Sequence, residues 1–166
     1  MKLYVMRHGP AEDQAHTGRD GDRALTPDGR ERVRDVVKAL KAANEAPLSI
    51  VSSPLVRAVQ TAEIVAAAAG LDGAVEIRKE MGPSENKMSL LAAMLGAGRK
   101  RLMIVGHEPD LSMLVARLVG SPPHQGMKKA MVVGLKLEQA ASAGPGFQAF
   151  PRFVLDPKTL AWDRSG

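Results

Sequence analysis

At 166 residues the chain has the length of one ordinary domain, and its 45% apolar and 25% charged residues suit a packed globular core rather than a disordered chain. Because it contains no cysteine, disulfide frameworks, thiol nucleophiles and cysteine-based zinc or iron–sulfur sites are excluded. The net charge of +5 invites a nucleic-acid interpretation, but one Trp, one Tyr and three Phe residues are too few to form a platform on which bases stack, so no nucleic acid is expected as a partner.

The apolar stretches of the chain predict a cytoplasmic protein. Residues 1–6 form an apolar run that is too short for a signal peptide, and Arg7 and His8 interrupt it. The longest apolar stretch elsewhere, at 64–69, falls far short of the ~20 residues that a membrane span needs. We therefore expect a soluble protein that is not exported and does not bind a membrane.

Short apolar and β-branched runs alternate with segments of helical periodicity along the chain. The runs predict strands at 3–6, 48–51, 75–78, 102–105, 130–137 and 147–155. The periodic segments predict helices at 27–43, 54–69, 87–95 and 111–119. Polar and small residues predict surface loops at 10–24 and 140–146.

Three of these helices carry residues that are typical of a helix start. Thr26 and Pro27 predict an N-cap followed by a first helical residue, and Ser53 with Pro54 repeats this pattern. Asp110 is placed to cap the helix at 111–119.

The alternation of strands with helices predicts the fold class. We expect an α/β three-layer sandwich, in which a mainly parallel sheet has helices on both faces. No linker or internal repeat divides the sequence, so residues 1–166 are expected to form a single domain.

Side chains that can bind ligands or take part in catalysis follow the ends of the predicted strands. Ligands of open parallel sheets bind outside the carboxyl ends of the strands. Arg7 and His8 follow the first strand, and His107 follows the fourth. Ser53 follows the second strand, and Arg57 lies one turn into the next helix. Two guanidinium and two imidazole groups are therefore expected to converge at one edge of the sheet.

This set of residues predicts a site for a phosphoryl group. Two arginines within reach of one point bind a dianion, because each guanidinium matches phosphate oxygens with paired N–H groups and stays charged. The chain contains neither G-x-x-x-x-G-K-[ST] nor G-x-G-x-x-G, and its carboxylates and histidines do not fall at metal-ligand spacing. We therefore expect no metal and no other cofactor, and His8 becomes the natural nucleophile.

Four motifs in this order resemble those of the histidine phosphatase superfamily. They are Arg-His-Gly at 7–9, Leu-Thr-Pro-Asp-Gly at 25–29, Ser-Ser-Pro-Leu-Val-Arg-Ala-Val-Gln-Thr-Ala at 52–62 and Gly-His-Glu-Pro at 106–109. The chain is most similar to the small bacterial phosphohistidine phosphatases of the SixA type. This resemblance implies a phosphoglycerate mutase-like fold and a phosphatase that works without a metal.

The resemblance also implies individual roles for the site residues. His8 would carry the phosphoryl group, while Arg7, Arg57 and His107 would bind its oxygens, and Ser53 is a further candidate for phosphate binding. Two carboxylates are candidates for the proton donor. Glu80 follows the third strand as the acid of the related mutases does, and Glu108 follows His107 where the acid-phosphatase branch carries an aspartate. For each of them, a plain surface position is the alternative.

The length of the segment at 81–101 bears on the substrate. It leaves room for one helix but not for the cap subdomain that encloses small substrates in larger relatives. An open cationic site suits a phosphohistidine presented on a signalling phosphotransfer protein. The alternatives are a phosphomonoesterase or mutase for a small phosphorylated metabolite and, less well supported, a non-catalytic binder of phosphate or nucleic acid. The sequence predicts neither the physiological substrate nor the oligomeric state.

Overall fold

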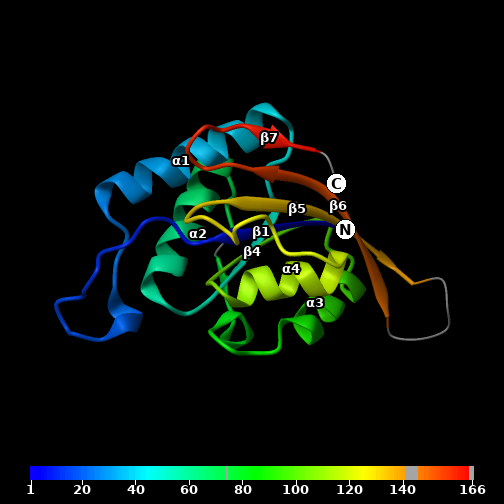
Figure 1. Ribbon diagram of the computed structural model, residues 1–166, viewed down its shortest axis with the longest axis horizontal. Helices are drawn as coiled ribbons and strands as arrows, with labels where there is room; N and C mark the ends of the chain where they lie inside the picture. The colour runs from blue at the N-terminus through cyan, green and yellow to red at the C-terminus, as the bar shows by residue number, and fades with distance from the viewer. Residues whose placement is uncertain (74, 141–145, 165–166) are drawn as a thin grey trace.

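The computed structural model of the protein describes residues 1–73, 75–140 and 146–164. Within these residues, seven strands form one sheet in the order β3-β2-β4-β1-β5-β6-β7 (Figure 1). The strands are β1 (Lys2–Arg7), β2 (Ser49–Ser52), β3 (Glu76–Ile77), β4 (Arg101–Gly106), β5 (Val132–Gln139), β6 (Phe147–Leu155) and β7 (Trp162–Asp163). The helices are α1 (Pro27–Ala42), α2 (Val56–Ala69), α3 (Lys87–Gly96) and α4 (Asp110–Val119), with short 3-10 helices η1 (Asp20–Asp22) and η2 (Lys79–Met81).

The sheet has a parallel half and an antiparallel half. The strands β3, β2, β4 and β1 pair in parallel, whereas β5, β6 and β7 add in antiparallel pairs. The predicted α/β class is confirmed, and the sheet is mixed: β5 runs antiparallel to β1, and β6 and β7 extend it without a described helix between them. Strands that follow one another without a crossover helix pair antiparallel. The sequence did not predict β7, which adds only two residues to the edge.

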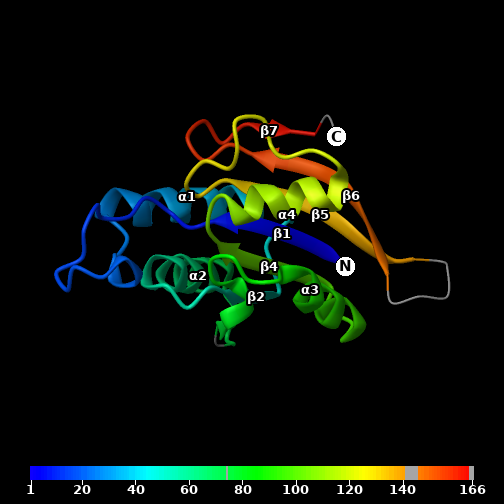
Figure 2. The same cartoon turned by 60° about the horizontal axis from the view of Figure 1, so that its bottom comes forward.

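Alternating side chains of each strand pack against a different pair of helices. Leu3 and Val5 belong to the apolar core that α3 and α4 cover. Tyr4 and Met6 belong to the core that α1 and α2 cover on the opposite face. This two-residue period produces the predicted three layers, with the sheet in the middle (Figures 1 and 2).

The helix starts agree only in part with the prediction. Thr26 caps α1 as expected, and its hydroxyl accepts from the Gly29 N–H at 3.0 Å. The prediction that Ser53 caps α2 is wrong, because α2 begins at Val56 with Leu55 as its N-cap. Asp110 is the first residue of α4 rather than its cap. The predicted loop at 140–146 lies largely outside the described residues.

Candidate active site

Three neighbouring parallel strands bring the predicted residues to one edge of the sheet. His8, Ser53 and His107 are the residues that directly follow β1, β2 and β4. These strands lie in the order β2-β4-β1, with Arg7 level with Gly106, so their carboxyl ends lie side by side. The His8 N–H donates to the Gly106 carbonyl at 3.1 Å and ties two of the strand ends together. This edge is where the blue chain leaves β1 in Figure 1.

The His8 ring is buried and neutral. Its Nδ1 atom lies 2.7 Å from the Gly9 carbonyl oxygen, so Nδ1 carries the hydrogen that it donates to this carbonyl. The pKa of His8 is lowered to about 3, mainly by burial, and the neighbouring His107, Arg57 and Arg7 side chains also disfavour its protonated form. The Nε2 atom therefore keeps its lone pair near neutral pH, as a nucleophile requires.

Close packing around Gly9 fixes the chain that follows His8. A Cβ atom at position 9 would lie 2.8 Å from the Cγ2 atom of Val33, so a larger residue would displace α1. The Gly9 N–H donates to the Thr61 hydroxyl at 3.0 Å, and this hydroxyl donates to the Arg57 carbonyl at 2.7 Å. His8 is thereby tied to both helices of one sheet face.

The Arg7 guanidinium is bound by protein on one side. Its Nη1 atom donates to the Met127 carbonyl at 2.8 Å. Its Nε atom is buried and has no hydrogen-bond partner among the described residues. Burial lowers the pKa of Arg7, and the negative charge of Glu108 acts in the opposite direction, so the group remains a cation.

The Arg57 guanidinium is held in a similar way by the loop that follows β1. Its Nη1 atom donates to the Asp20 carbonyl at 2.8 Å, and its Nη2 atom donates to Asp20 Oδ2 at 3.0 Å. The hydrogen bond from Arg57 lowers the pKa of the Asp20 carboxyl. The Nε atom of Arg57 is again buried, without a partner in the described part of the chain.

The His107 ring completes the set. Its centroid lies 5.3 Å from that of His8. Its Nε2 atom lies 2.7 Å from the Ser53 hydroxyl oxygen, while its Nδ1 atom is buried without a partner among the described residues. The pKa of His107 is lowered to about 4, first by burial and then by the charges of Arg57 and Lys87. The ring is therefore neutral near pH 7.

Among the residues that the structure describes, three buried nitrogen atoms at this site have no hydrogen-bond partner, namely Arg7 Nε, Arg57 Nε and His107 Nδ1. No other buried side-chain nitrogen or oxygen atom in the described ranges is without one. A buried polar group without a partner costs free energy and calls for an explanation. A bound anion is one such explanation, because anions accept hydrogen bonds from guanidinium and imidazole nitrogens.

The Glu108 carboxylate is occupied by donors from the neighbouring backbone and side chains. Its Oε1 accepts from the Ser112 N–H at 3.0 Å, and its Oε2 accepts from the Ser112 hydroxyl at 2.6 Å and the Met127 N–H at 3.4 Å. Since the Met127 carbonyl binds Arg7, Glu108 fixes the loop that orients this guanidinium. These contacts favour a positioning role over that of a proton donor.

Glu80 lies in η2, the short helix after β3, and its side chain is half-buried. Within the described residues, no hydrogen bond or ion pair joins Glu80 to the two arginines or the two histidines of the site. Its role as proton donor stays a prediction.

Sequence reasoning did not identify two residues that shape this site. Asp20 holds Arg57 from an exposed loop, and Met127 holds Arg7 through its carbonyl oxygen. The acidic composition of the loop at 10–24 is a signal for Asp20, since a buried arginine needs an acceptor. Every residue carries a backbone carbonyl, so the residue type at position 127 gave no indication that this carbonyl binds Arg7.

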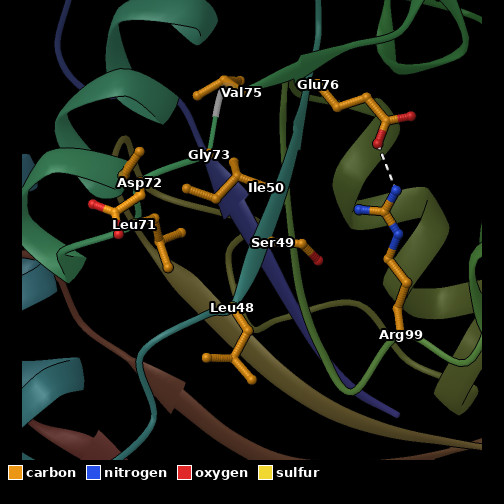
Figure 3. A pocket seen from close by; sticks show the side chains of 10 residues that line it. Leu48, Ser49, Ile50, Leu71, Asp72, Gly73, Val75, Glu76 and Arg99 are labelled. Carbon is orange, nitrogen blue, oxygen red and sulfur yellow. Dashed lines mark hydrogen bonds and ion pairs between the residues drawn. The ribbon is translucent and has the colours of Figure 1, made fainter.

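A separate cavity of about 250 Å³ lies at the β3 edge of the sheet, between the start of β2 and Arg99 (Figure 3). An ion pair between Arg99 and Glu76 closes one side of it, at 2.6 Å. None of the residues lining this cavity belongs to the candidate site.

Neither a metal-binding cluster nor a membrane-spanning helix occurs in the described ranges. No group of three or more histidine, aspartate or glutamate side chains there is arranged to hold a metal ion. No helix in the same ranges has the length and apolar character to cross a membrane.

The two buried histidines are expected to make stability depend on acid pH. Their pKa values of about 3 and 4 lie below the ordinary 6.5, so at intermediate pH the unfolded chain binds protons that the folded protein does not. Stability should therefore fall as the pH decreases from about 6.5 towards 4. We expect the His8→Gln/His107→Gln double variant to lose less stability than the unchanged protein between about pH 7 and about pH 5, as measured by urea unfolding midpoints. Equal losses in the two proteins would contradict this expectation.

Comparison with known proteins identifies the family. The model of the histidine phosphatase superfamily (branch 1) matches residues 3–85, which include Arg7, His8, Ser53 and Arg57. An uncharacterized protein from Picosynechococcus sp. is 36% identical over 141 residues, which cover 82% of this chain and 85% of that protein.

Relatives with a described activity or a solved structure agree with this assignment. The phosphohistidine phosphatase SixA of Escherichia coli is 25% identical over 154 residues, which cover 91% of this chain and 94% of that protein. The structure of the protein histidine phosphatase SixA complexed with tungstate has a TM-score of 0.83 at 25% identity, covering 97% of this chain and 100% of the other. The chain therefore belongs to the histidine phosphatase superfamily (branch 1) and is a phosphatase of the SixA type.

Proposed function

We propose that the protein hydrolyses phosphohistidine on a cytoplasmic signalling phosphotransfer protein, through a phosphoryl intermediate on His8 and without a metal or other cofactor. The observation that carries this proposal is the group of three unpartnered buried nitrogen atoms around His8. They belong to Arg7, Arg57 and His107, and a phosphoryl group has three oxygens to accept their hydrogen bonds. The tungstate complex of SixA concerns an oxyanion of similar shape and supports the same ligand class.

In the first step, the lone pair of His8 Nε2 forms a bond to phosphorus while the bond between phosphorus and the substrate imidazole nitrogen breaks. The departing nitrogen takes a proton from water. Negative charge spreads over the phosphoryl oxygens in the transition state, where Arg7, Arg57 and His107 stabilise it without moving. The Gly9 carbonyl holds Nδ1–H of His8 and so keeps Nε2 directed to the reaction.

In the second step, water attacks phosphorus and the bond to His8 Nε2 breaks. The electron pair of this bond returns to the ring, one proton of the water is released to solvent, and inorganic phosphate leaves. The same three side chains bind the oxygens, because the charge develops on the same atoms. The low pKa of His8 favours its release as a neutral ring.

The placement of the segment after η2 supports a protein substrate. The segment after η2 forms α3, whose Leu90, Leu91 and Met94 are buried in the core on one sheet face. Figures 1 and 2 show α3 towards the end of the sheet where the chain begins, away from the carboxyl end of β1. SixA, which is similar over nearly the full chain, carries the name of a phosphohistidine phosphatase.

A substrate panel combined with two variants tests this proposal. We expect faster hydrolysis of a phosphohistidine-bearing protein than of phosphoserine or sugar phosphates. Imidazole leaves readily once water protonates it, so Glu80→Gln and Glu108→Gln should each keep most of this activity. Hydrolysis of a phosphate ester needs an acid that protonates the leaving oxygen. The rate of ester hydrolysis should therefore fall by ~10²–10⁴-fold in the variant that lacks this acid.

The same panel distinguishes the alternative enzyme. If sugar phosphates were the better substrates, or if either glutamine variant lost phosphohistidine activity as fully as His8→Ala, a metabolite phosphatase or mutase with an essential acid would be supported instead. A uniform fall across all leaving groups in Glu108→Gln would point to its hold on Met127 rather than to proton donation.

A further inference from the structure

Ser53 makes contacts that differ from those of a residue that binds substrate directly. Its side chain is fully buried and in contact with His107. Its Oγ atom lies 2.7 Å from His107 Nε2 and accepts from the Leu55 N–H at 3.3 Å. The hydroxyl thus connects the start of α2 with the ring that follows β4.

The hydrogen-bond capacity of the hydroxyl decides where its hydrogen lies. A serine hydroxyl has one hydrogen to donate and two lone pairs to accept with. The Leu55 N–H donates to one lone pair of the Ser53 hydroxyl. Within the described contacts, His107 Nε2 is the acceptor that remains for the hydroxyl hydrogen. If Nε2 carried a hydrogen instead, the Ser53 hydroxyl would accept twice and bury its own hydrogen without a partner, which is costly.

We propose that Ser53 is a positioning residue that donates to Nε2 of His107 and thereby holds this ring in the tautomer with its hydrogen on Nδ1. The inference rests on the proposed function, because it assigns the phosphoryl-binding hydrogen of that site to Nδ1. Under this proposal Ser53 acts on the phosphate through His107, whereas the sequence led us to expect a direct contact.

The reaction requires this tautomer of His107. A neutral imidazole donates through only one of its nitrogens, and Nδ1 is the nitrogen left unpartnered at the site. A lone pair on Nδ1 would repel the phosphoryl oxygens. Burial and the neighbouring cations keep the pKa of His107 at about 4, so a second hydrogen is not available near neutral pH.

Nitrogen NMR of protein labelled with ¹⁵N in its histidine rings tests the proposal without substrate. We expect His107 to show a protonated Nδ1 and a bare Nε2 near neutral pH. The exposed rings of His16 and His124 serve as references for unconstrained histidines, and His107→Gln identifies the signals of His107. A hydrogen on Nε2, alone or together with one on Nδ1, would overturn the proposal. The protein's activity does not enter this measurement, so failure of the proposed function would be a separate result.

Variants at two neighbouring serines provide the control. We expect Ser53→Ala to lose the fixed tautomer and to bind orthovanadate roughly 10–100-fold more weakly, as for loss of one hydrogen bond to a charged group. Ser52→Ala removes an equally buried hydroxyl, which donates to the Ser53 carbonyl at 2.9 Å, and should leave the His107 signals unchanged. Ser53→Thr keeps a hydroxyl and should restore both readouts. Unchanged signals in Ser53→Ala, or equal effects of the two alanine variants, would contradict the assignment.

Discussion

Replacing His8 by alanine is expected to abolish turnover and to remove every trace of a phosphoryl enzyme. Loss of a covalent nucleophile costs on the order of 10⁴–10⁶-fold in rate, more than any other single change at this site. The nucleophilic atom is Nε2, since Nδ1 donates to the Gly9 carbonyl. The fold should survive, because the contacts of the His8 ring are polar ones, to the Gly9 carbonyl and beside the His107 ring.

A brief acid-free quench with labelled phosphohistidine substrate measures this outcome. The unchanged protein should retain a phosphoryl group that is labile to acid and stable to alkali, as expected for a phosphorus–nitrogen bond, and EDTA should leave its activity intact. His8→Ala should retain no label. Label on a serine, or unimpaired turnover of His8→Ala, would contradict the mechanism.

The position of His8 was predictable because the βα pattern is local in the sequence. Short apolar runs followed by helical periodicity identify parallel strands, and parallel strands deliver the residues after them to one edge. His8, Ser53 and His107 follow three such runs. The register that places Arg7 level with Gly106 then results from pairing of two buried strands of equal length.

The details that orient these side chains were not predictable, because they depend on contacts between distant segments. Asp20 and Met127 bind the two guanidinium groups from loops far away in sequence. The Ser53 hydroxyl was expected to cap α2, a local role that its sequence context favours, yet α2 begins only at Val56, and the hydroxyl contacts His107 besides accepting from the Leu55 N–H. A tertiary contact outweighs the local propensity here.

Arg57→Ala and His107→Ala are expected to reduce turnover by about 10²–10³-fold each, as is typical for removal of one donor to transition-state charge. Each residue carries a buried nitrogen atom that has no hydrogen-bond partner among the described residues. The rates are measured under saturating phosphohistidine substrate, together with thermal melts of each variant. A loss of stability large enough to leave the variants unfolded at the assay temperature would assign both residues a structural role instead.

Asp20→Ala provides the matched control for Arg57, because it removes the carboxylate half of the same contact and leaves the guanidinium in place. If Arg57 acted only by holding the exposed loop, the two variants would lose activity equally. Arg57 is buried, with 8% of its side chain exposed, whereas 63% of the Asp20 side chain is exposed, so the carboxylate contributes little beyond orientation. We therefore expect Asp20→Ala to keep most of its turnover, because the Arg57 guanidinium is still present and its Nε atom can bind a phosphoryl oxygen. Arg57→Ala removes this guanidinium and should lose most of its turnover.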